Sequence, residues 1–334
     1  MIKHFKKIVA ILACILTAAI VTNEKLSVYA AEKYLYLGGF TAGFDIDTEG
    51  VTVVGVADVI TDDKRISPAR ESGIKVGDVI LKMNDKICNR ASDIQEVLNN
   101  YKEGYIVTVI KRDGAEMSLD VFPEKDMSGR YKLGVFLRDG LSGIGTVTYI
   151  KENGEFASLG HSVCSQNGEP CKVIGGNVYK CEIIGVNKGK YKRAGELKGV
   201  FVGEKPIGSV SANYPVGLYG KLSDFNGENF IKAEVGEAKI GKAKIYSCVS
   251  GLEVKNYDIE IAKVDLSEAE GKNLVIKITD KSLISITGGI VQGMSGSPIV
   301  QNGKIVGAVT HVFLNDATRG FGVAIDKMLA ARGD

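Results

Sequence analysis

The chain has 334 residues, of which 25% are charged and 45% are hydrophobic, and its formal net charge is +2. This balance of charges excludes an overall basic electrostatic field that could hold nucleic acid. The length exceeds the roughly 100 to 200 residues of one domain, so we expect two domains. The 41 glycines and 6 prolines, with no tryptophan, favour short strands joined by turns over long helices.

The first 30 residues have the pattern of an export signal. Three lysines lie within the first seven residues, an apolar run extends from Ile8 to Val21, and small residues precede Ala31. The pattern is typical of a secretory signal peptide or an uncleaved signal anchor. The run is short for a membrane span of about 20 residues, which favours cleavage. We therefore expect residues 1–30 to direct export.

Residues 34–125 predict a domain of mixed strands and helix. Ser92 and Gln95 form a capping box before a helix whose apolar residues recur at helical spacing. The segment SPARESGIKVGDVILKMNDKICNRASDIQEVL resembles a PDZ domain of the kind attached to bacterial proteases.

This resemblance implies a peptide-binding function for the domain. The loop at Gly43 and Phe44 would take the place of the carboxylate-binding loop and hold a peptide C-terminus through backbone N–H groups. The peptide would add as a strand beside the Ser92 helix. The alternative is a module that packs against the next domain and binds nothing.

Residues 131–330 predict a second, all-β domain after a linker at residues 126–130. Short apolar strands alternate with Asn-Gly, Glu-Gly and Gly-Lys turns, which is typical of a sandwich or barrel. A hairpin over residues 146–159 ends at Gly160 and His161, where an imidazole can face a cleft.

A small-residue turn carrying Ser295 runs directly into a second hairpin of this domain, in the segment GGIVQGMSGSPIVQNGKIVGAVTH. Its glycines allow successive N–H groups to point into one space, which suits an oxyanion. No helical periodicity follows the turn, which argues against an α/β-hydrolase. The arrangement resembles the nucleophile loop of chymotrypsin-like serine peptidases, which implies an oxyanion hole formed by the N–H groups of Gly293 and Ser295.

Two histidines follow the export signal, His161 and His311. His161 lies just after a strand end, so we expect it to be the general base for Ser295. His311 lies on the strand that leaves the Ser295 hairpin, where it is better placed to line a substrate pocket.

Cysteine usage indicates neither a complete disulfide framework nor a zinc site. The five cysteines beyond the export signal include no C-x-x-C pair. Buried thiols are the favoured state, and the alternative is one disulfide within the cluster formed by Cys164, Cys171 and Cys181. We expect no metal and no cofactor. The cysteines are Cys88, Cys164, Cys171, Cys181 and Cys248.

Two segments, GIGTVTYIKENGEFASLGHSV and GGIVQGMSGSPIVQNGKIVGAVTHVF, together resemble the stage IV sporulation protein B family of serine peptidases. The resemblance implies a mainly β fold: an N-terminal signal or anchor helix, an α+β PDZ domain, and a chymotrypsin-like double β-barrel. It also implies a catalytic triad of His161, Asp280 and Ser295, in which Asp280 holds the imidazole.

The acid is the least defined member of this triad. Asp280 lies close before Ser295 in the chain, whereas chymotrypsin-like folds usually bring their acid from the first barrel. Three further aspartates therefore remain alternatives, namely Asp224, Asp258 and Asp265.

The family resemblance also implies a biological role. Such an enzyme is exported across the forespore membrane into the intermembrane space, is membrane-anchored before cleavage, and cuts itself. It then cuts a regulatory membrane protein of the sigma factor processing complex, which activates an intramembrane protease. The expected partners are therefore itself, that membrane protein and a peptide at the PDZ domain, without nucleic acid.

Two other functions compete with this one. The first is a PDZ-type peptide-binding regulator with an inactive peptidase-like domain. The second is a quality-control protease, but those enzymes typically place PDZ modules after the catalytic domain, and here the module comes first.

Overall fold

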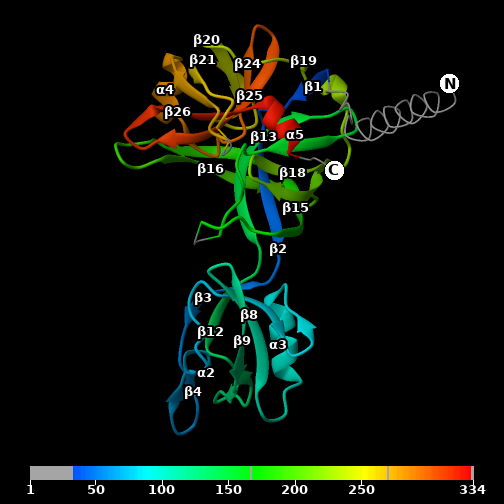
Figure 1. Cartoon of the computed structure of the whole chain (residues 1–334), viewed down its shortest axis with the longest axis vertical. Coiled ribbons are helices and arrows are strands. Elements are labelled where there is room, and N and C mark those ends of the chain that lie inside the picture. The colour runs from blue at the N-terminus through cyan, green and yellow to red at the C-terminus, as the bar shows by residue number, and fades with distance from the viewer. Residues whose placement is uncertain (1–32, 166–167, 269–270, 332–334) are drawn as a thin grey trace, which may run out of the picture. The chain divides into compact units, whose positions relative to one another are not determined.

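A computed structural model describes residues 33–165, 168–268 and 271–331 of the chain (Figure 1). The fold is mainly β, as predicted, with 53% of residues in strands and 10% in helices. The expected signal or anchor at residues 1–30 lies outside the described residues. Among those that are described, no helix is long and apolar enough to cross a membrane.

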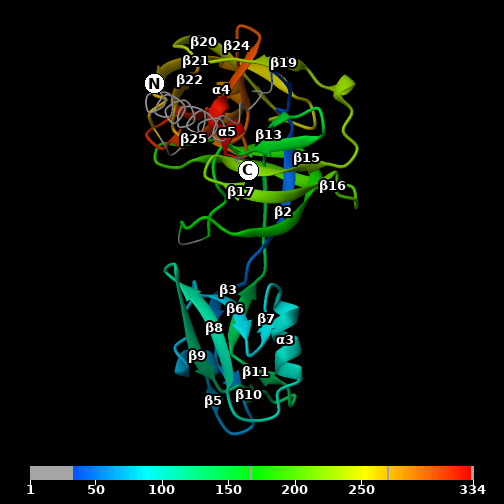
Figure 2. The same ribbon diagram turned by 45° about the vertical axis from the view of Figure 1, so that its right-hand side comes forward.

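A six-stranded sheet and two helices form the PDZ-like part of the chain. The core between the sheet and helix α3 includes Val53, Ile80, Ile94 and Ile110, and Figure 2 shows α3 beside this sheet. The sheet order is β12 (Val135–Arg138), β3 (Val51–Val56), β6 (Val79–Met83), β8 (Ile106–Arg112) and β9 (Ala115–Val121), with β7 (Lys86–Ile87) on β6; the helices are α2 (Pro68–Glu71) and α3 (Ala91–Asn99).

Helix α3 confirms the predicted helix, but its first turn is capped differently from the expected Ser92–Gln95 box. The Asp93 carboxylate accepts hydrogen bonds from the backbone N–H groups of Asn89 and Arg90 at 3.0 and 2.9 Å. A carboxylate in the first turn satisfies free donors and favours the positive end of the helix dipole. The helix therefore begins at Ala91.

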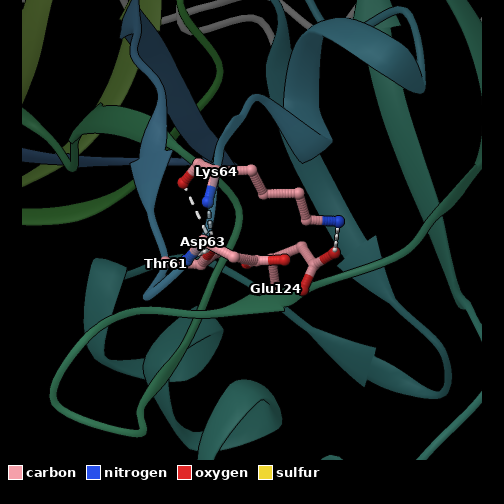
Figure 3. Close-up of polar contacts among 4 residues, drawn as sticks. All are labelled: Thr61, Asp63, Lys64 and Glu124. Atoms are coloured by element: carbon pink, nitrogen blue, oxygen red, sulfur yellow. Dashed lines mark hydrogen bonds and ion pairs between the residues drawn. The ribbon is translucent and has the colours of Figure 1, made fainter.

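Two short hairpins complete this part of the chain: β4 (Val59–Ile60) pairs with β5 (Arg65–Ile66), and β10 (Glu124–Lys125) pairs with β11 (Tyr131–Lys132). The turn between β4 and β5 is closed by a bond from Thr61 Oγ1 to Asp63 Oδ1 of 2.7 Å (Figure 3). This hydrogen bond lowers the pKa of Asp63. Lys64 Nζ lies 3.2 Å from Glu124 and so links the two hairpins (Figure 3).

The remaining strands belong to one large sheet that closes on itself. Six strands form a first barrel, because the last strand of the series pairs again with the first. Its core includes Phe44, Val147, Phe156 and Leu218. The order is β2 (Thr41–Thr48), β13 (Leu141–Ile150), β14 (Glu155–Ser158), β18 (Gly217–Leu222), β17 (Gly208–Tyr214) and β15 (Val173–Asn187).

A second circuit of six strands closes in the same way. Its core includes Ile245, Ile259, Ile276 and Ile299. The order is β20 (Gly241–Ser247), β21 (Lys255–Val264), β22 (Leu274–Ile278), β26 (Asp316–Ala324), β25 (Lys304–Phe313) and β24 (Pro298–Gln301).

Two strands connect the circuits, and two more extend the first one. β1 (Tyr34–Leu37) and β19 (Lys232–Val235) lie between β13 and β25, while β16 (Gly195–Val202) and β23 (Val291–Gln292) extend from β15. The described helices of these regions are short: η1 (Gly227–Asn229), α4 (Lys281–Thr287) and α5 (Ile325–Ala330).

The prediction that Gly43 and Phe44 form a peptide-binding loop is wrong. Both residues lie inside β2, which pairs with β13 along one edge and with β15 along the other, so its backbone groups are engaged on both sides. Phe44 is 2% exposed in the barrel core, and a Cβ on Gly43 would meet the Phe201 ring at 2.1 Å. The first two strands of the expected 34–125 domain therefore build the large sheet.

The position of β2 in the large sheet leads to a testable prediction. Phe44→Ala removes a buried ring from the barrel and should lower the free energy of unfolding by about 3 to 5 kcal/mol. In hydrogen-exchange mass spectrometry, peptides from β13 and β15 should lose protection first. Phe122→Ala, at a ring that is 60% exposed, is the matched control. Loss of protection confined to β3 and β6 would contradict the assignment.

Candidate active site

The turn that carries Ser295 lies between β23 and β24 and is shaped by two glycines with positive φ. Gly293 has φ +97° and Gly296 has φ +94°, a region that residues with a Cβ rarely adopt. A Cβ on Gly296 would meet the Thr146 carbonyl oxygen at 2.0 Å. Glycine is therefore required where the turn approaches β13.

Side chains and backbone of β13 hold this turn. Thr146 N–H donates to the Ser295 carbonyl at 3.0 Å, and Thr146 Oγ1 donates to the Gly293 carbonyl at 2.8 Å. The carbonyls of the turn thus face the first barrel. The turn also has five backbone N–H groups, those of residues 293–297.

Two of these N–H groups have no acceptor within the part of the chain that the structure describes, those of Gly293 and Ser295. By contrast, Met294 donates to Val291, Gly296 to Val309 and Ser297 to Met294. Gly293 and Ser295 are the two donors that the sequence predicts for an oxyanion hole. Their availability is the property that such a hole requires.

The two serines of the turn have different environments. Ser297 is fully buried, and its Oγ bonds to Ser247 Oγ at 3.0 Å. Ser295 is half-buried, and its Oγ donates to the Thr310 carbonyl at 2.7 Å. Only Ser295 lines the cleft described below, so it is the serine that can react with a bound molecule.

His161 reaches the same cleft through a sharp turn after β14. Leu159 and Gly160 have φ +67° and +71°, and a Cβ on Gly160 would meet Thr310 Cγ2 at 2.8 Å. The His161 ring Nδ1 lies 2.9 Å from the Ser162 carbonyl oxygen. Burial lowers the pKa of His161 below 6.5, and the hydrogen bond with Ser162 offsets this only in part.

His311 lies beside His161, with the ring centroids 4.9 Å apart. It lines the cleft. Desolvation, followed by the nearby His161 and Lys272, lowers the pKa of His311 to about 4. Both imidazoles are therefore neutral at pH 7.

The cleft has a volume of about 1190 Å³ and brings together Ser295, His161 and His311. Its other walls are largely apolar, and none of the described residues that line it is an aspartate or a glutamate. The apolar side chains nearest to the Ser295 turn in sequence are Ile290, Val291, Val312 and Leu314.

The structure does not bring Asp280 to His161. Asp280 is the N-cap of α4, and its Oδ1 accepts from Ser282 N at 2.9 Å and Leu283 N at 3.0 Å. Burial raises the pKa of Asp280, but hydrogen bonds led by that from Ser282 lower it further, to a value below the usual one. The Asp280 carboxylate is thus hydrogen-bonded to the first turn of α4.

The alternative aspartates also lie apart from His161. Asp258 pairs with Lys244 at 2.9 Å and Asp265 with Lys263 at 3.0 Å, both on the surface. Asp224 lines a different cavity, beside Phe225 and Phe230. Asp280 thus caps a helix, and Asp258 and Asp265 form surface ion pairs. The positions of these residues in the sequence did not predict these contacts.

All five described cysteines are free thiols. Cys88, Cys181 and Cys248 are buried, whereas Cys164 is exposed, and burial raises the pKa of both Cys88 and Cys181 to about 11. Such thiols are poor nucleophiles. Within the described ranges, no group of three potential ligands lies close enough to hold a metal.

Comparison with known proteins identifies two regions of the chain. The pattern of the family described as SpoIVB peptidase S55 matches residues 129–329, and that of the PDZ domain matches residues 42–122. A putative zinc metalloprotease of Treponema pallidum (strain Nichols) is 31% identical over 78 residues, which are 23% of this chain and 17% of that protein. The chain therefore matches less than a fifth of the length of this relative.

One solved structure with a similar chain is the Rv3671c protease in its inactive form. The similarity has a TM-score of 0.34 and 16% identity, and it covers 56% of this chain and 82% of that one.

The environment of His161 predicts how Ser295 reactivity depends on pH. A neutral imidazole is needed to accept the Ser295 proton, and burial keeps the His161 ring neutral to a lower pH than usual. The rate of Ser295 modification by a fluorophosphonate should therefore be constant near pH 7 and fall at lower pH, with a midpoint below 6.5. A midpoint above 6.5 would contradict this environment.

Proposed function

Because the chain belongs to the SpoIVB peptidase S55 family, we propose that this PDZ-containing serine peptidase is exported, cleaves itself, and then cuts a regulatory membrane protein during sporulation. The observation that carries the catalytic part is the presence of Ser295 and His161 in one cleft, with two unengaged N–H groups beside the serine. Self-cleavage and the membrane-protein substrate rest on the family resemblance.

The proposed reaction begins when the Ser295 hydroxyl leaves the Thr310 carbonyl by rotation about its Cα–Cβ bond. His161 accepts the hydroxyl proton while Oγ bonds to the carbonyl carbon of the substrate, and the displaced π electrons form an oxyanion. The N–H groups of Gly293 and Ser295 donate to this oxyanion. The imidazolium then protonates the leaving amine as the C–N bond breaks.

Water completes the cycle. His161 takes a proton from a water molecule, whose oxygen attacks the acyl carbon of the ester on Ser295. The second oxyanion forms at the same N–H pair. Its collapse breaks the ester bond, releases the carboxylic acid product, and returns the proton to Ser295.

The walls of the cleft favour apolar substrate side chains. Ile290 and Val291 precede the Ser295 turn, Val312 follows His311, and the described residues of the cleft include no carboxylate to pair with a basic side chain. Burying an unpaired charge among such residues is costly. We therefore expect cleavage after apolar residues in preference to lysine or arginine.

A groove of about 600 Å³ between α3 and β12 is the proposed peptide-binding site of the PDZ domain. Ile94 and Leu98 line it from the helix, and Phe136 lines it from β12. β12 is the edge of its sheet, so an extended peptide can add beside it. This groove replaces the excluded site at Gly43 and Phe44.

One end of the groove can receive a peptide C-terminus. The N–H groups of Leu133 and Gly134 have no acceptor among the described residues, and Arg130 and Lys132 line the same end. A carboxylate would be bound by N–H donors and attracted by Lys132, whereas Arg130 lies 3.8 Å from Asp126, which lines the same groove.

Localisation to the space between the forespore membranes is part of the proposal. It is supported by the sequence pattern of residues 1–30, which is typical of an export signal, and by the family. Membrane attachment before cleavage would place the peptidase near a membrane-bound substrate.

The regulator without peptidase activity remains the second candidate, because Ser295 Oγ bonds to the Thr310 carbonyl in the structure and not to His161. If the Ser295 hydroxyl could not break its hydrogen bond to the Thr310 carbonyl, the protein would function through its peptide-binding groove.

Self-cleavage distinguishes the two candidates. Protein beginning at Ala31 should fragment on incubation, as seen by mass spectrometry, because Ser295 is the accessible serine of the turn. Ser295→Ala should abolish fragmentation, a loss of about 10⁶-fold in rate, whereas Ser297→Ala should retain it at a rate reduced only by any effect on folding. Equal cleavage in the parent and Ser295→Ala, with contaminating protease excluded, would reject the nucleophile.

Binding at the groove is tested with fluorescent decapeptide libraries. Peptides with a free C-terminus should bind at least tenfold more tightly than amidated ones, because the loss of one charged hydrogen bond costs about 1.5 kcal/mol or more. Exchange of both Arg130 and Lys132 for glutamate should remove this preference. Lys75→Glu, at an exposed lysine away from the groove, should leave it intact; equal binding of both libraries to the parent would reject the site.

A further inference from the structure

The tip of the hairpin formed by β15 and β16 carries a dense positive charge. Residues 188–193 read KGKYKR, and the three lysines and the arginine among them are exposed. Within the described ranges, none of these four cations forms an ion pair with a carboxylate. Exposed lysines are common on protein surfaces, so the charge alone identifies no partner. The side chains around the tip are needed to identify one.

Large apolar side chains are exposed beside these cations. Tyr191 is 73% exposed at the tip, Leu314 is 54% exposed in the turn between β25 and β26, and Ile286 is 40% exposed on α4. Hydrogen bonds hold these three segments together. Lys192 N–H donates to the Leu314 carbonyl at 2.7 Å, and Lys188 Nζ donates to a carbonyl of α4 at 2.5 Å. One surface therefore combines cations with exposed aromatic and aliphatic groups.

We propose that this docking surface, formed by residues 188–193 with Ile286 and Leu314, attaches the peptidase to a bilayer of anionic phospholipids. Lysine and arginine are attracted to the phosphate groups of such lipids, while tyrosine and aliphatic side chains lie favourably at the level of the headgroups. An acidic peptide would pair with the cations but would leave the apolar side chains without a contact. A lipid surface provides contacts for both kinds of group.

The acidic residues nearest in sequence to the tip and to Leu314 do not neutralise the docking surface. Glu196, on β16, accepts a hydrogen bond from Asn187 Nδ2 at 2.6 Å. Asp316, on β26, accepts one from Thr318 Oγ1 at 2.6 Å. Four cations and two carboxylates leave a local excess of positive charge, which an anionic surface would attract.

The tip is held in one conformation by its own backbone. Lys190 and Arg193 exchange two hydrogen bonds between N–H and carbonyl groups, at 2.9 and 2.8 Å. Lys192 lies between them with φ +63°, a conformation that residues other than glycine seldom adopt. Its Nζ lies 5.4 Å from the centroid of the Tyr191 ring. A surface whose backbone is already ordered loses less conformational entropy when it binds.

The docking surface borders the catalytic cleft. Leu314 belongs to both, and Ala194, which directly follows the tip, also lines the cleft. A bilayer in contact with the docking surface would therefore place this side of the cleft at the level of the headgroups. The geometry then favours substrate segments that lie just outside a membrane, and this last step alone rests on the proposed peptidase function.

Vesicle binding tests the inference without relying on catalysis. Protein beginning at Ala31 retains every described residue, with both closed circuits and their cores, and Ser295→Ala removes any self-cleavage that depends on the serine. This protein should co-sediment with vesicles of equal parts phosphatidylglycerol and phosphatidylcholine, and not with phosphatidylcholine alone. Raising the salt concentration from about 0.05 to about 0.5 M should weaken binding, because ions screen the attraction.

Neutralising two cations of the tip should weaken this binding. Each lysine near an anionic surface contributes about fivefold to the partition coefficient. Lys190→Gln combined with Lys192→Gln should therefore lower the coefficient about 25-fold, at an unchanged thermal midpoint because both side chains are exposed. The matched control is Lys239→Gln combined with Lys242→Gln, at two exposed lysines near the start of β20, which should leave the coefficient close to that of the parent.

A fluorescent probe locates the contact. The chain has no tryptophan, so Tyr191→Trp places a single indole at the tip. Its emission should shift to shorter wavelength with anionic vesicles and be quenched by brominated lipid. Ile240→Trp, at a side chain that is 69% exposed, is the control and should show neither change. Gln301 bonds to carbonyls on both sides of Ile240 and holds it near the start of β25, whereas Leu314 follows the end of that strand.

Failure of the parent to bind anionic vesicles would overturn the inference, as would equal losses in the two pairs of lysine variants. Equal spectral shifts at residues 191 and 240 would indicate adsorption without the docking surface and would also overturn it. Binding of an aspartate-rich peptide but not of vesicles would replace lipid by an acidic protein ligand. None of these outcomes bears on Ser295, whose role is tested by self-cleavage, so failure of the docking surface and failure of the proposed peptidase function are distinguishable.

Discussion

The hydrogen bonds between β13 and the Ser295 turn are the contacts on which the active site depends. Thr146 binds the carbonyls of Gly293 and Ser295, and Thr148 Oγ1 donates to the Gly296 carbonyl at 2.7 Å. Both threonines are fully buried, so these bonds form away from competing water. They fix the orientation of the turn, in which the N–H groups of Gly293 and Ser295 have no acceptor among the described residues. Strand β13 of the first barrel thereby positions Ser295, which lies just before β24 of the second barrel.

The connection between β2 and β13 has a consequence for the architecture. These strands are neighbours in the first barrel, with Ile46 opposite Leu141, yet the PDZ-like sheet lies between them in sequence. The barrel therefore cannot close until the whole inserted segment has been synthesised. Phe44 and Ile144, on these two strands, also line the catalytic cleft. The chain thus joins the PDZ-like part to strands that form the walls of the peptidase cleft.

Electrostatics in the cleft are dominated by burial. The pKa values of His161 and His311 are both lowered, chiefly by desolvation, and the described residues that line the cleft include no carboxylate. Neutral imidazoles can act as bases and acceptors at pH 7, but the charged form of His161 gains little stabilisation from its surroundings.

Local sequence patterns determined the hairpins, helix α3, the glycine-shaped turn at Ser295 and the placement of His161 after a strand, because each depends on residues close together in the chain. Tertiary structure alone decided three other features: the partners of β2, the bond from Ser295 to the Thr310 carbonyl, and the role of Asp280. A strand has two edges, and its sequence does not state which strands will pair with them. A carboxylate binds the donors that the fold brings to it, and for Asp280 these are the N–H groups of α4.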